Sequence, residues 1–305
     1  METPTIMKQG RLVPWLYVLP ALFMIVVFVV YPMLSTTQLS FTDRHGTGSA
    51  SAQCVKGQPC WGVFENYRYA LTNPEMTTAL RNNALWLLVM VPLTVAIGLL
   101  VAVLADRVKY EGLVKALIFM PMAISFIGAG VIWRFMYDIQ TGANQPQIGV
   151  LNAALTGVGA KPVPWLSTQP LNNFALMMVG IWLWAGFSMT ILSAALKGLP
   201  NEILEAARVD GANEWQLFWR IMIPMIMPTI TVVATTLLII VLKIFDIVFV
   251  MTNGNFGTEV IANRMFNLIV TNVGRSTAIA VLLLVLTIPV MYFNVRRFRE
   301  QESMR

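Results

Sequence analysis

Side chains that could carry out catalysis or hold a metal ion are scarce in this sequence. The chain has one histidine, His45, and two cysteines, and it contains no H-E-x-x-H motif. None of its lysines is followed by Ser or Thr, so a phosphate-binding G-x-x-x-x-G-K-[ST] loop is absent. His45 lies in a predicted loop and cannot complete a Ser–His pair with Ser188, which lies in an apolar stretch. We predict that the chain is not an enzyme and that it binds neither ATP nor a metal ion itself.

The two cysteines, Cys54 and Cys60, leave two interpretations open. Both fall in a predicted outward loop, where an oxidising exterior would allow them to close a small disulfide. They could equally be two free thiols. A metal site that added His45 would lack a fourth ligand nearby, so no metal centre is predicted here.

The stretch Leu199–Pro224 is polar yet has the signals of ordered helices. Asn201 is placed to cap a short helix over Glu202–Val209, with the carboxylates of its first residue and of Glu205 near its positive end. The Asp-Gly pair ending at Gly211 would terminate this helix, because glycine readily supplies the left-handed residue that closes a helix.

A second helix is predicted directly after the first. Asn213 is placed to cap it, and Gln216 stands at the capping-box position. Trp215, Phe218 and Trp219 form its apolar face at i, i+3, i+4 spacing. Two interpretations of this helix–turn–helix stay open: a rigid element that transmits movement to or from a partner, or an amphipathic hairpin that lies on the lipid surface.

Membrane helices are predicted on both sides of this hairpin. Of the 305 residues, 57% are hydrophobic and 12% are charged, against about 25% charged in soluble domains. Since about 20 helical residues cross a bilayer, and open strand edges cannot be satisfied in lipid, we predict an all-α polytopic membrane protein with six transmembrane helices. The predicted spans are Leu12–Leu34, Ala84–Leu104, Leu113–Tyr137, Phe174–Ala195, Ile221–Leu242 and Thr277–Val295.

Basic residues predict the orientation of these spans. They gather in the segments after the second and fourth spans and in the C-terminal tail, whereas the segment 138–173 has only Lys161. By the positive-inside rule both termini are cytoplasmic. We predict one membrane domain over 1–305, with an extracytoplasmic loop at 35–83 and a cytoplasmic loop at 196–224. The outward loop should hold short helices broken at Asn73-Pro74, and 138–170 should form an irregular cap.

The cytoplasmic hairpin carries a family resemblance. It resembles the EAA loop of permease subunits from ATP-binding-cassette (ABC) importers, because Glu205-Ala206-Ala207 is followed after three residues by Gly211 and after nine more by Ile221-x-Ile223-Pro224. Ile223 departs from the more common Leu but keeps its apolar role. The extended form is Pro200-x-Glu202-Ile203-x-Glu205-Ala206-Ala207-x-x-Asp210-Gly211-Ala212.

Further motifs resemble the sugar-permease branch, that of the larger maltose-permease subunit and the alpha-glucoside permeases. They are Leu19-Pro20, Tyr31-Pro32, Phe64-x-Asn66-Tyr67, Arg81-Asn82-Asn83, Phe245-Asp246 and Thr252-Asn253-Gly254. The segment Asn255-Phe256-Gly257 departs from the pattern, because many relatives have a second Gly and a Pro there. That departure puts the local turn and any substrate contact at it in doubt.

The resemblance implies a type I ABC importer permease in a bacterial or archaeal inner membrane. It implies two permease subunits, expected to form a heterodimer, two cytoplasmic ATPase subunits that bind ATP and Mg, and an external solute-binding protein. Nucleic acid is not an expected partner. The helix Glu202–Val209 would then dock into a groove on the ATPase, and ATPase closure would rock the spans between inward-open and outward-open states. The coupling residues would be Glu202, Glu205, Ala206, Ala207, Asp210, Gly211 and Ala212.

Candidate substrate-path residues follow from the chemistry of sugar sites, which combine aromatic rings with a few polar groups. The resemblance places such residues on spans that flank the EAA loop, which makes Trp184, Phe187 and Ser188 candidates. Asn83, a polar residue where the second span opens, is the fourth candidate. For each aromatic residue, packing or anchoring at the membrane interface is the competing interpretation. An ion-gradient-driven secondary transporter is the alternative function, although no internal repeat with midplane carboxylates is evident.

Overall fold

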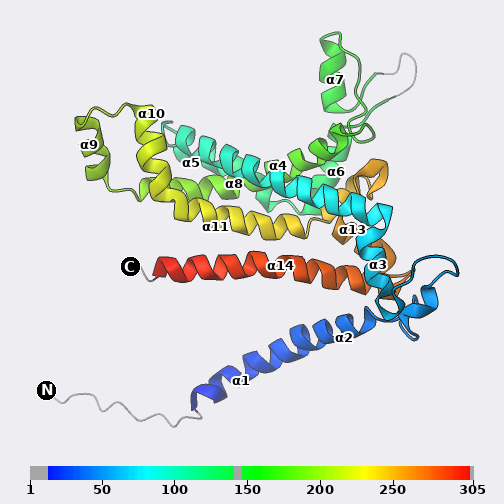
Figure 1. Ribbon diagram of the computed structural model, residues 1–305. Helices are drawn as coiled ribbons and strands as arrows, with labels where there is room; N and C mark the ends of the chain where they lie inside the picture. The colour runs from blue at the N-terminus through cyan, green and yellow to red at the C-terminus, as the bar shows by residue number, and fades with distance from the viewer. Residues whose placement is uncertain (1–12, 141–145, 303–305) are drawn as a thin grey trace. The chain divides into compact units, whose positions relative to one another are not determined.

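The computed structural model describes residues 13–140 and 146–302 (Figure 1). Within this part of the chain the structure is helical with no strand, and one isolated bridge pairs Thr42 with Ser49. The helices are α1 (Val13–Ile25), α2 (Tyr31–Leu39), α3 (Glu65–Thr72), α4 (Pro74–Ala105), α5 (Glu111–Phe119), α6 (Phe126–Met136), α7 (Val150–Gly157), α8 (Leu171–Lys197), α9 (Asn201–Val209), α10 (Glu214–Leu217), α11 (Ile223–Leu242), α12 (Asp246–Met251), α13 (Ile261–Leu268) and α14 (Val273–Glu302).

Five helical stretches are long and apolar enough to cross a membrane, or six if one bent pair counts as a span. The all-α class and its apolar spans are therefore confirmed. The first predicted span started at Leu12, which lies outside the described residues. The five continuous stretches are Trp15–Leu39, Pro74–Ala105, Leu171–Lys197, Glu214–Leu242 and Val273–Tyr292.

The third predicted span, Leu113–Tyr137, is not one helix. The chain bends by 100° between Glu111–Ala123 and Phe126–Met136. A 3₁₀ turn around Pro121 leads into extended backbone, and the Ser125 side chain then accepts a hydrogen bond from the Gly128 N–H at 3.1 Å and starts α6. A new N-cap inside an apolar run ends one helix and begins another.

Prolines also shape the other spans. Two π-helical segments, Val26–Val30 and Phe218–Met222, each precede a proline by two residues, Pro32 and Pro224. Proline has no N–H to donate to the carbonyl four residues earlier, so the chain widens locally while the helix continues. The stretch Glu214–Leu242 is therefore a single membrane helix whose first turns belong to the hairpin.

The chain divides into two compact units, and each is described by itself. The first comprises Met1–Ala70 with Leu268–Val281. Its loop is organised by the fully buried side chain of Asn66, whose Nδ2 donates to the carbonyls of Ser40 at 2.9 Å and Thr42 at 2.7 Å. Gln53 in turn donates to Asn66 Oδ1 at 2.9 Å. The predicted Phe64-x-Asn66-Tyr67 motif therefore has a structural role in this unit.

The second unit comprises Leu71–Asn267 with Leu282–Arg305, and its core lies where α8 packs on α4, α5, α11 and α12. The close approach of α4 and α8 depends on small residues. A Cβ at Gly98 would lie 2.5 Å from Ser188 Cβ and 2.9 Å from the Met189 nitrogen, and a Cβ at Gly180 would lie 2.5 Å from Met90 Cε. Small residues at such contacts let membrane helices pack closely.

Two predicted loops differ from the structure. The break at Asn73-Pro74 exists, and the Asn73 side chain caps the next helix by accepting the Glu75 N–H at 2.9 Å. That helix, however, is the whole of α4 rather than a separate short helix, because nothing stops its continuation into the apolar run. The predicted cap 138–170 is not wholly irregular, since it contains α7.

Candidate functional site

The predicted coupling helix is present as α9, one residue longer than expected. Asn201 was predicted to cap it, and this is wrong: the N-cap position is Pro200, and Asn201 is the first helical residue. Pro200 fits there because its extended backbone presents its carbonyl to the Ile203 N–H at 3.3 Å. The first turn therefore begins on a backbone acceptor rather than on the Asn201 side chain.

The end of α9 has the predicted left-handed turn. Gly211 has φ of +86°, and the Ala212 N–H donates to the Ala207 carbonyl at 3.0 Å while the Asp210 N–H donates to the Ala206 carbonyl at 2.9 Å. A Cβ at Gly211 would meet no atom within 4 Å. A substitution there is costly only through its backbone conformation, by roughly 1 kcal/mol or more.

α9 presents one face away from the rest of its unit. At 100° per residue, Glu202, Glu205, Ala206 and Val209 share this outward face. All four are exposed, and Val209 is 86% exposed. Figure 1 shows α9 and α10 together at one end of the α4, α8 and α11 bundle. A free nine-residue helix is marginal in water, so this exposed helix has the form of a docking element.

The predicted capping box at the start of α10 is confirmed. Asn213 Oδ1 accepts the Gln216 N–H at 2.8 Å, and Gln216 Oε1 accepts the Asn213 N–H at 3.1 Å. The Arg208 Nε donates to Glu214 Oε1 at 3.0 Å across the turn. Both partners of this pair are exposed, so its contribution to stability is about 0–1 kcal/mol. The caps, rather than this pair, hold the turn in shape.

A cavity of about 460 Å³ lies between the hairpin and the ends of α4 and α8. Its walls are mainly apolar, and its rim carries charges of both signs. Leu204 and Arg208 of α9 line it, as does Trp215, which is 71% exposed and packs edge-on to Trp219 with ring centroids 5.6 Å apart. The inward face of α9 thus borders a hollow rather than a packed core.

The base of the hairpin is tied to the bundle by charges. Lys115 of α5 bonds Asp106, at the end of α4, at 2.5 Å and Glu111 at 2.6 Å. Lys197, the last residue of α8, also pairs with Glu111. Ser193 donates to Asp106 at 3.0 Å. These partly buried bonds link the ends of three helices next to the point where the chain enters α9.

Two of the four predicted substrate-path residues lie together. The half-buried rings of Trp184 and Phe187 contact each other edge-on at 5.5 Å, and Trp184 stacks on Phe126 at 6.1 Å. Trp184 and Phe126 also line a cavity of about 200 Å³ beside Ser125, at the bend of the broken span. An aromatic wall next to a bend is compatible with a solute path and with packing alike.

The other two path candidates lie elsewhere. Ser188 is fully buried against Gly98, and its hydroxyl has no hydrogen-bond partner. Asn83 donates to the Leu242 carbonyl at 3.3 Å and accepts the Ile261 N–H at 2.9 Å. Along α4, Asn83 and Gly98 are roughly 22 Å apart at 1.5 Å per residue. The structure therefore does not gather the four residues into one site.

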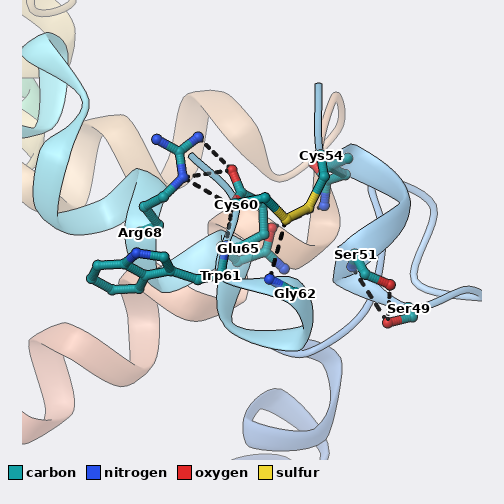
Figure 2. Close-up of a disulfide and its surroundings, with 10 residues drawn as sticks. Ser49, Ser51, Cys54, Cys60, Trp61, Gly62, Glu65 and Arg68 are labelled. Carbon is teal, nitrogen blue, oxygen red and sulfur yellow. Dashed lines mark hydrogen bonds and ion pairs between the residues drawn. A yellow bond between two sulfur atoms is a disulfide. The ribbon is translucent and has the colours of Figure 1, made fainter. Parts of the chain in front are cut away.

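The two cysteines are joined. Figure 2 shows the Cys54–Cys60 disulfide, with the two Cα atoms 5.6 Å apart. Glu65 lies beside it and accepts the Trp61 N–H at 3.1 Å and the Arg68 Nε at 2.9 Å. The Arg68 hydrogen bond holds the pKa of the Glu65 carboxyl below its usual value. Cys54, Cys60 and Glu65 lie near enough to suggest metal ligands, but the disulfide and the ion pair already use these groups.

A polar cavity at the other end of α4 contains residues that the sequence analysis missed. It measures about 380 Å³, and its lining includes Glu75 and Thr78 from the start of α4. The remaining lining residues come from the segment between α12 and α13 and from α13 itself: Asn253, Gly254, Asn255, Gly257, Glu259, Arg264 and Asn267. The sequence signal was the Thr252-Asn253-Gly254 motif, which marks the turn but not its partners on α4.

Comparison with known proteins agrees with this architecture. The chain is 50% identical over 95% of its length to the osmoprotective compounds uptake permease protein GgtC of Synechocystis sp. (strain ATCC 27184 / PCC 6803 / Kazusa), covering all of that protein. It is 45% identical over 93% of its length to the alpha-glucoside transport system permease protein AglF of Rhizobium meliloti (strain 1021), covering 81% of it.

A solved structure shares the fold of this chain, and a family model gives its family. The fold matches a chain of a bacterial ABC transporter that imports the acidic polysaccharide alginate, with a TM-score of 0.76 and 22% identity over 94% of this chain and 95% of that one. The family model described as "Binding-protein-dependent transport system inner membrane component" matches residues 5–297. Together with the exposed α9 hairpin on a bundle of apolar helices, these matches show that the chain belongs to the family of inner-membrane components of binding-protein-dependent transport systems.

Proposed function

We propose that this chain forms the translocation path of an ATP-driven importer for a sugar, either an oligosaccharide or an alpha-glucoside. An external binding protein would hand the solute over, and separate ATPase subunits would supply energy through α9. The exposed α9 hairpin is the observation that carries this proposal. Its outward face holds Glu202 and Glu205, and its closing turn requires a left-handed residue at Gly211.

The hairpin supports a mechanism in which α9 moves as a rigid body. Both ends of the turn are closed by hydrogen bonds, and α10 continues without interruption into the membrane helix Glu214–Leu242. The base of α8 is held to α4 and α5 by Lys115 and Lys197. A push on α9 would therefore reach the spans through α8 on one side and α11 on the other.

The partners follow from this mechanism. Two cytoplasmic ATPase subunits would carry ATP and Mg, because this chain has no P-loop. A second permease subunit would complete the path, and the family description supports the external binding protein. A groove on the ATPase would receive the outward face of α9 as a helix-in-groove contact.

The orientation of the chain in the inner membrane is part of the proposal. Basic residues gather near α9: Arg107, Lys197 and Arg208 line the cavity beside it. Lys115 bonds Asp106 at the end of α4, and Arg220 lies in the π-helical segment that follows α10. Such an excess of Lys and Arg is typical of the cytoplasmic side. We infer from this excess that α9 and both chain termini are cytoplasmic and that the cavity at the start of α4 faces outward.

The solute class is supported by the names of the relatives. A permease for osmoprotective compounds and a permease for alpha-glucosides are 50% and 45% identical to this chain over more than nine-tenths of its length. An alpha-glucoside is rich in hydroxyl groups, which both donate and accept hydrogen bonds. A polar cavity at the proposed outer end is consistent with such a solute.

The coupling assignment is tested with two variants in the reconstituted complex, Gly211→Val and Glu205→Lys. We expect both to insert normally but to lose most import and binding-protein-stimulated ATP hydrolysis. Gly159→Val is the matched control, because Gly159 also has a positive φ, +81°, with no atom within 4 Å of an added Cβ, but lies outside the hairpin.

Two outcomes would contradict the proposal. If Gly211→Val and Glu205→Lys retain their ATPase partner and import at the wild-type rate, α9 is not the coupling element. If uptake proceeds without ATPase subunits and follows an ion gradient, the alternative of a secondary transporter replaces the importer. If no saccharide stimulates ATP hydrolysis in the wild-type complex with its binding protein, the solute class is wrong.

A further inference from the structure

The polar cavity at the start of α4 lies at the opposite end of the bundle from the hairpin. α4 contributes Glu75 and Thr78 to this cavity and Leu100 and Val103 to the cavity beside α9. Since 25 residues of helix separate Glu75 from Leu100, the two cavities are roughly 38 Å apart at 1.5 Å per residue. Its volume of about 380 Å³ falls within the roughly 300–1,000 Å³ of ligand pockets.

The lining of this cavity is polar throughout. Every lining side chain is a carboxylate, a carboxamide, a hydroxyl or a guanidinium, apart from two glycines. Arg264 forms an ion pair with Glu75, and Asn267 donates to Asn253 Oδ1 at 3.2 Å. The wall therefore offers both donors and acceptors, as vicinal hydroxyl groups require.

The charges of the wall largely cancel. The charge of Arg264 is matched by Glu75. Glu259 is 9% exposed, and its Oε1 accepts the Val260 N–H at 3.1 Å and the Asn263 Nδ2 at 2.6 Å. Burial raises the pKa of the Glu259 carboxyl. An acidic ligand would find no unmatched cation in this lining, because Arg264 is paired with Glu75, and this favours a neutral polar ligand over an anion.

The turn that builds the cavity is held in an unusual backbone shape. Asn253, Gly254, Phe256 and Gly257 all have positive φ, between 49° and 78°. Such a conformation is strained for Phe256, which has a Cβ, and strain of this kind persists only where surrounding contacts enforce it. Strained residues cluster at functional sites, so the contacts that hold this turn in its strained conformation bear on the function of the cavity.

Three carboxamides enforce the turn, and two of them, Asn82 and Asn172, are buried. Asn172 Nδ2 donates to the Phe256 carbonyl at 2.8 Å, and so does Gln169 Nε2 at 2.6 Å. Asn82 Nδ2 donates to the carbonyls of Gly257 and Glu259, each at 2.8 Å. The backbone is thereby fixed from α4 and from the start of α8, while the Phe256 side chain stays 55% exposed.

We propose that this cavity is a binding subsite for a neutral polyhydroxylated solute at the mouth of the path. Thr78, Asn255, Asn267 and Glu259 bond its hydroxyl groups, and the exposed ring of Phe256 covers an apolar face of the sugar. The proposal rests on the proposed function and names where the solute first contacts this chain. The preformed turn lowers the ordering cost of binding.

The test measures binding of radiolabelled sucrose, trehalose and maltose to the full transporter complex in nanodiscs without its binding protein, with glycine betaine as a compound that lacks hydroxyl groups. Asn255→Ala and Thr78→Val each remove one bonding group, and Phe256→Asn removes the ring while keeping a residue that tolerates the left-handed conformation. Gln58→Ala is the control, because Gln58 is an exposed carboxamide outside the cavity.

We expect at least one saccharide to bind the wild type and Gln58→Ala equally, and glycine betaine to bind neither. Each cavity variant should weaken saccharide binding by roughly threefold to tenfold, as expected for one lost hydrogen bond or ring contact. Stimulation of ATP hydrolysis by the saturated binding protein should change less than twofold in the control variant Gln58→Ala.

Three results would overturn the proposal, and they separate it from the proposed function. If the wild type imports a saccharide but the cavity variants bind it as tightly as wild type, the subsite is wrong while the importer assignment stands. If the variants keep saccharide binding but lose stimulation by the binding protein, the cavity is a protein-docking surface. If no saccharide binds and none is imported, the solute class fails first, and the subsite fails with it.

Discussion

The two ends of the α4–α8–α11 bundle are built in different ways. At the hairpin end, α9 is exposed, the cavity beside it is largely apolar, and local caps hold the turn at Gly211. At the opposite end, the turn through Phe256 is clamped by buried side chains from two other helices, and its cavity is polar. The hairpin end is held in shape by its own hydrogen bonds, whereas the opposite end is a polar cavity held in shape by neighbouring helices.

The difference has a physical basis in where each backbone finds its hydrogen bonds. The hairpin satisfies its own groups within Pro200–Gln216, so it keeps its shape when its surroundings move. The turn after α12 takes its bonds from Asn82, Gln169 and Asn172, so its shape depends on the packing of α4 against α8. A hairpin that keeps its own shape is suited to transmitting movement, and a turn fixed by its neighbours is suited to binding a ligand.

Breaking the contact between α4 and α8 should have the largest effect, because it is the main packing contact in the core of the second unit. Gly98→Val would drive a side chain into Ser188 and the Met189 backbone. We expect a loss of about 3 kcal/mol of stability, which fluorescence-detected thermal unfolding in detergent would measure. Gly112→Val is the control, because no atom lies within 4 Å of its added Cβ. Equal stability of the two variants would refute the packing account.

Removing the clamp should affect one end alone. Asn82→Leu deletes two buried hydrogen bonds to the turn, each 2.8 Å long, and we expect a cost of about 2 kcal/mol. Hydrogen exchange followed by mass spectrometry should show faster exchange over residues 253–260 and unchanged exchange over 201–217. Faster exchange at both places would mean that the two ends are not independent.

Removing the hairpin cap gives the reciprocal result with a smaller effect. Asn213→Ala loses the bond from the Gln216 N–H and should cost about 1 kcal/mol. The same exchange measurement should show faster exchange over 213–217 and no change over 253–260. Asn213→Ser keeps a capping oxygen and should restore protection. An Asn213→Ser variant as labile as Asn213→Ala would show that the cap does not hold the turn.

The smallest expected effect is on how stability depends on pH. Two buried carboxyls should contribute to this dependence with opposite signs. The pKa of Glu259 is raised by burial, so its contribution to stability is complete below its ordinary value of 4.5 and is lost as the pH rises through its folded-state pKa. The pKa of Glu65 is lowered by Arg68, so its contribution is present above 4.5 and is lost as the pH falls through its folded-state pKa.

Glutamine substitutions test these signs by thermal unfolding at pH 4 and pH 7. Relative to wild type, the stability of Glu259→Gln should be higher at pH 7 than at pH 4, because the buried wild-type carboxyl loses its stabilising contribution as the pH rises, whereas the amide does not titrate. Relative to wild type, the stability of Glu65→Gln should be lower at pH 7 than at pH 4, because the amide cannot form the ion pair with Arg68. Identical pH profiles for wild type and both variants would contradict the assignment.

Local patterns predicted the hairpin well. The Asn213–Gln216 box and the left-handed Gly211 depend on hydrogen bonds between residues a few positions apart, so the residue types alone indicate them. The cap of α9 was placed one residue late because Asn201 has the preferred side chain, although the Pro200 carbonyl serves instead. The candidate coupling residues therefore followed from sequence, and their role in coupling stays a prediction.

Other features could not be predicted because long-range contacts decide them. The hydropathy of the third span is continuous, so it did not show the 100° bend at Ser125. Ser188 and Asn83 looked like path residues by type, yet one packs on Gly98 and the other bonds Leu242 and Ile261. Nothing in a single sequence states which helix a polar side chain will meet.

Sequence alone was enough to predict a bundle of membrane helices with a polar helical hairpin between two of them. Apolar runs of fixed length and caps at fixed spacing are local properties, and they require no knowledge of the partner helices. Only the tertiary structure decided that Glu75, Glu259 and Arg264 share one polar cavity. Almost 190 residues separate the first from the last, and it is the packing of α4 and α8 that brings the clamping carboxamides to the turn.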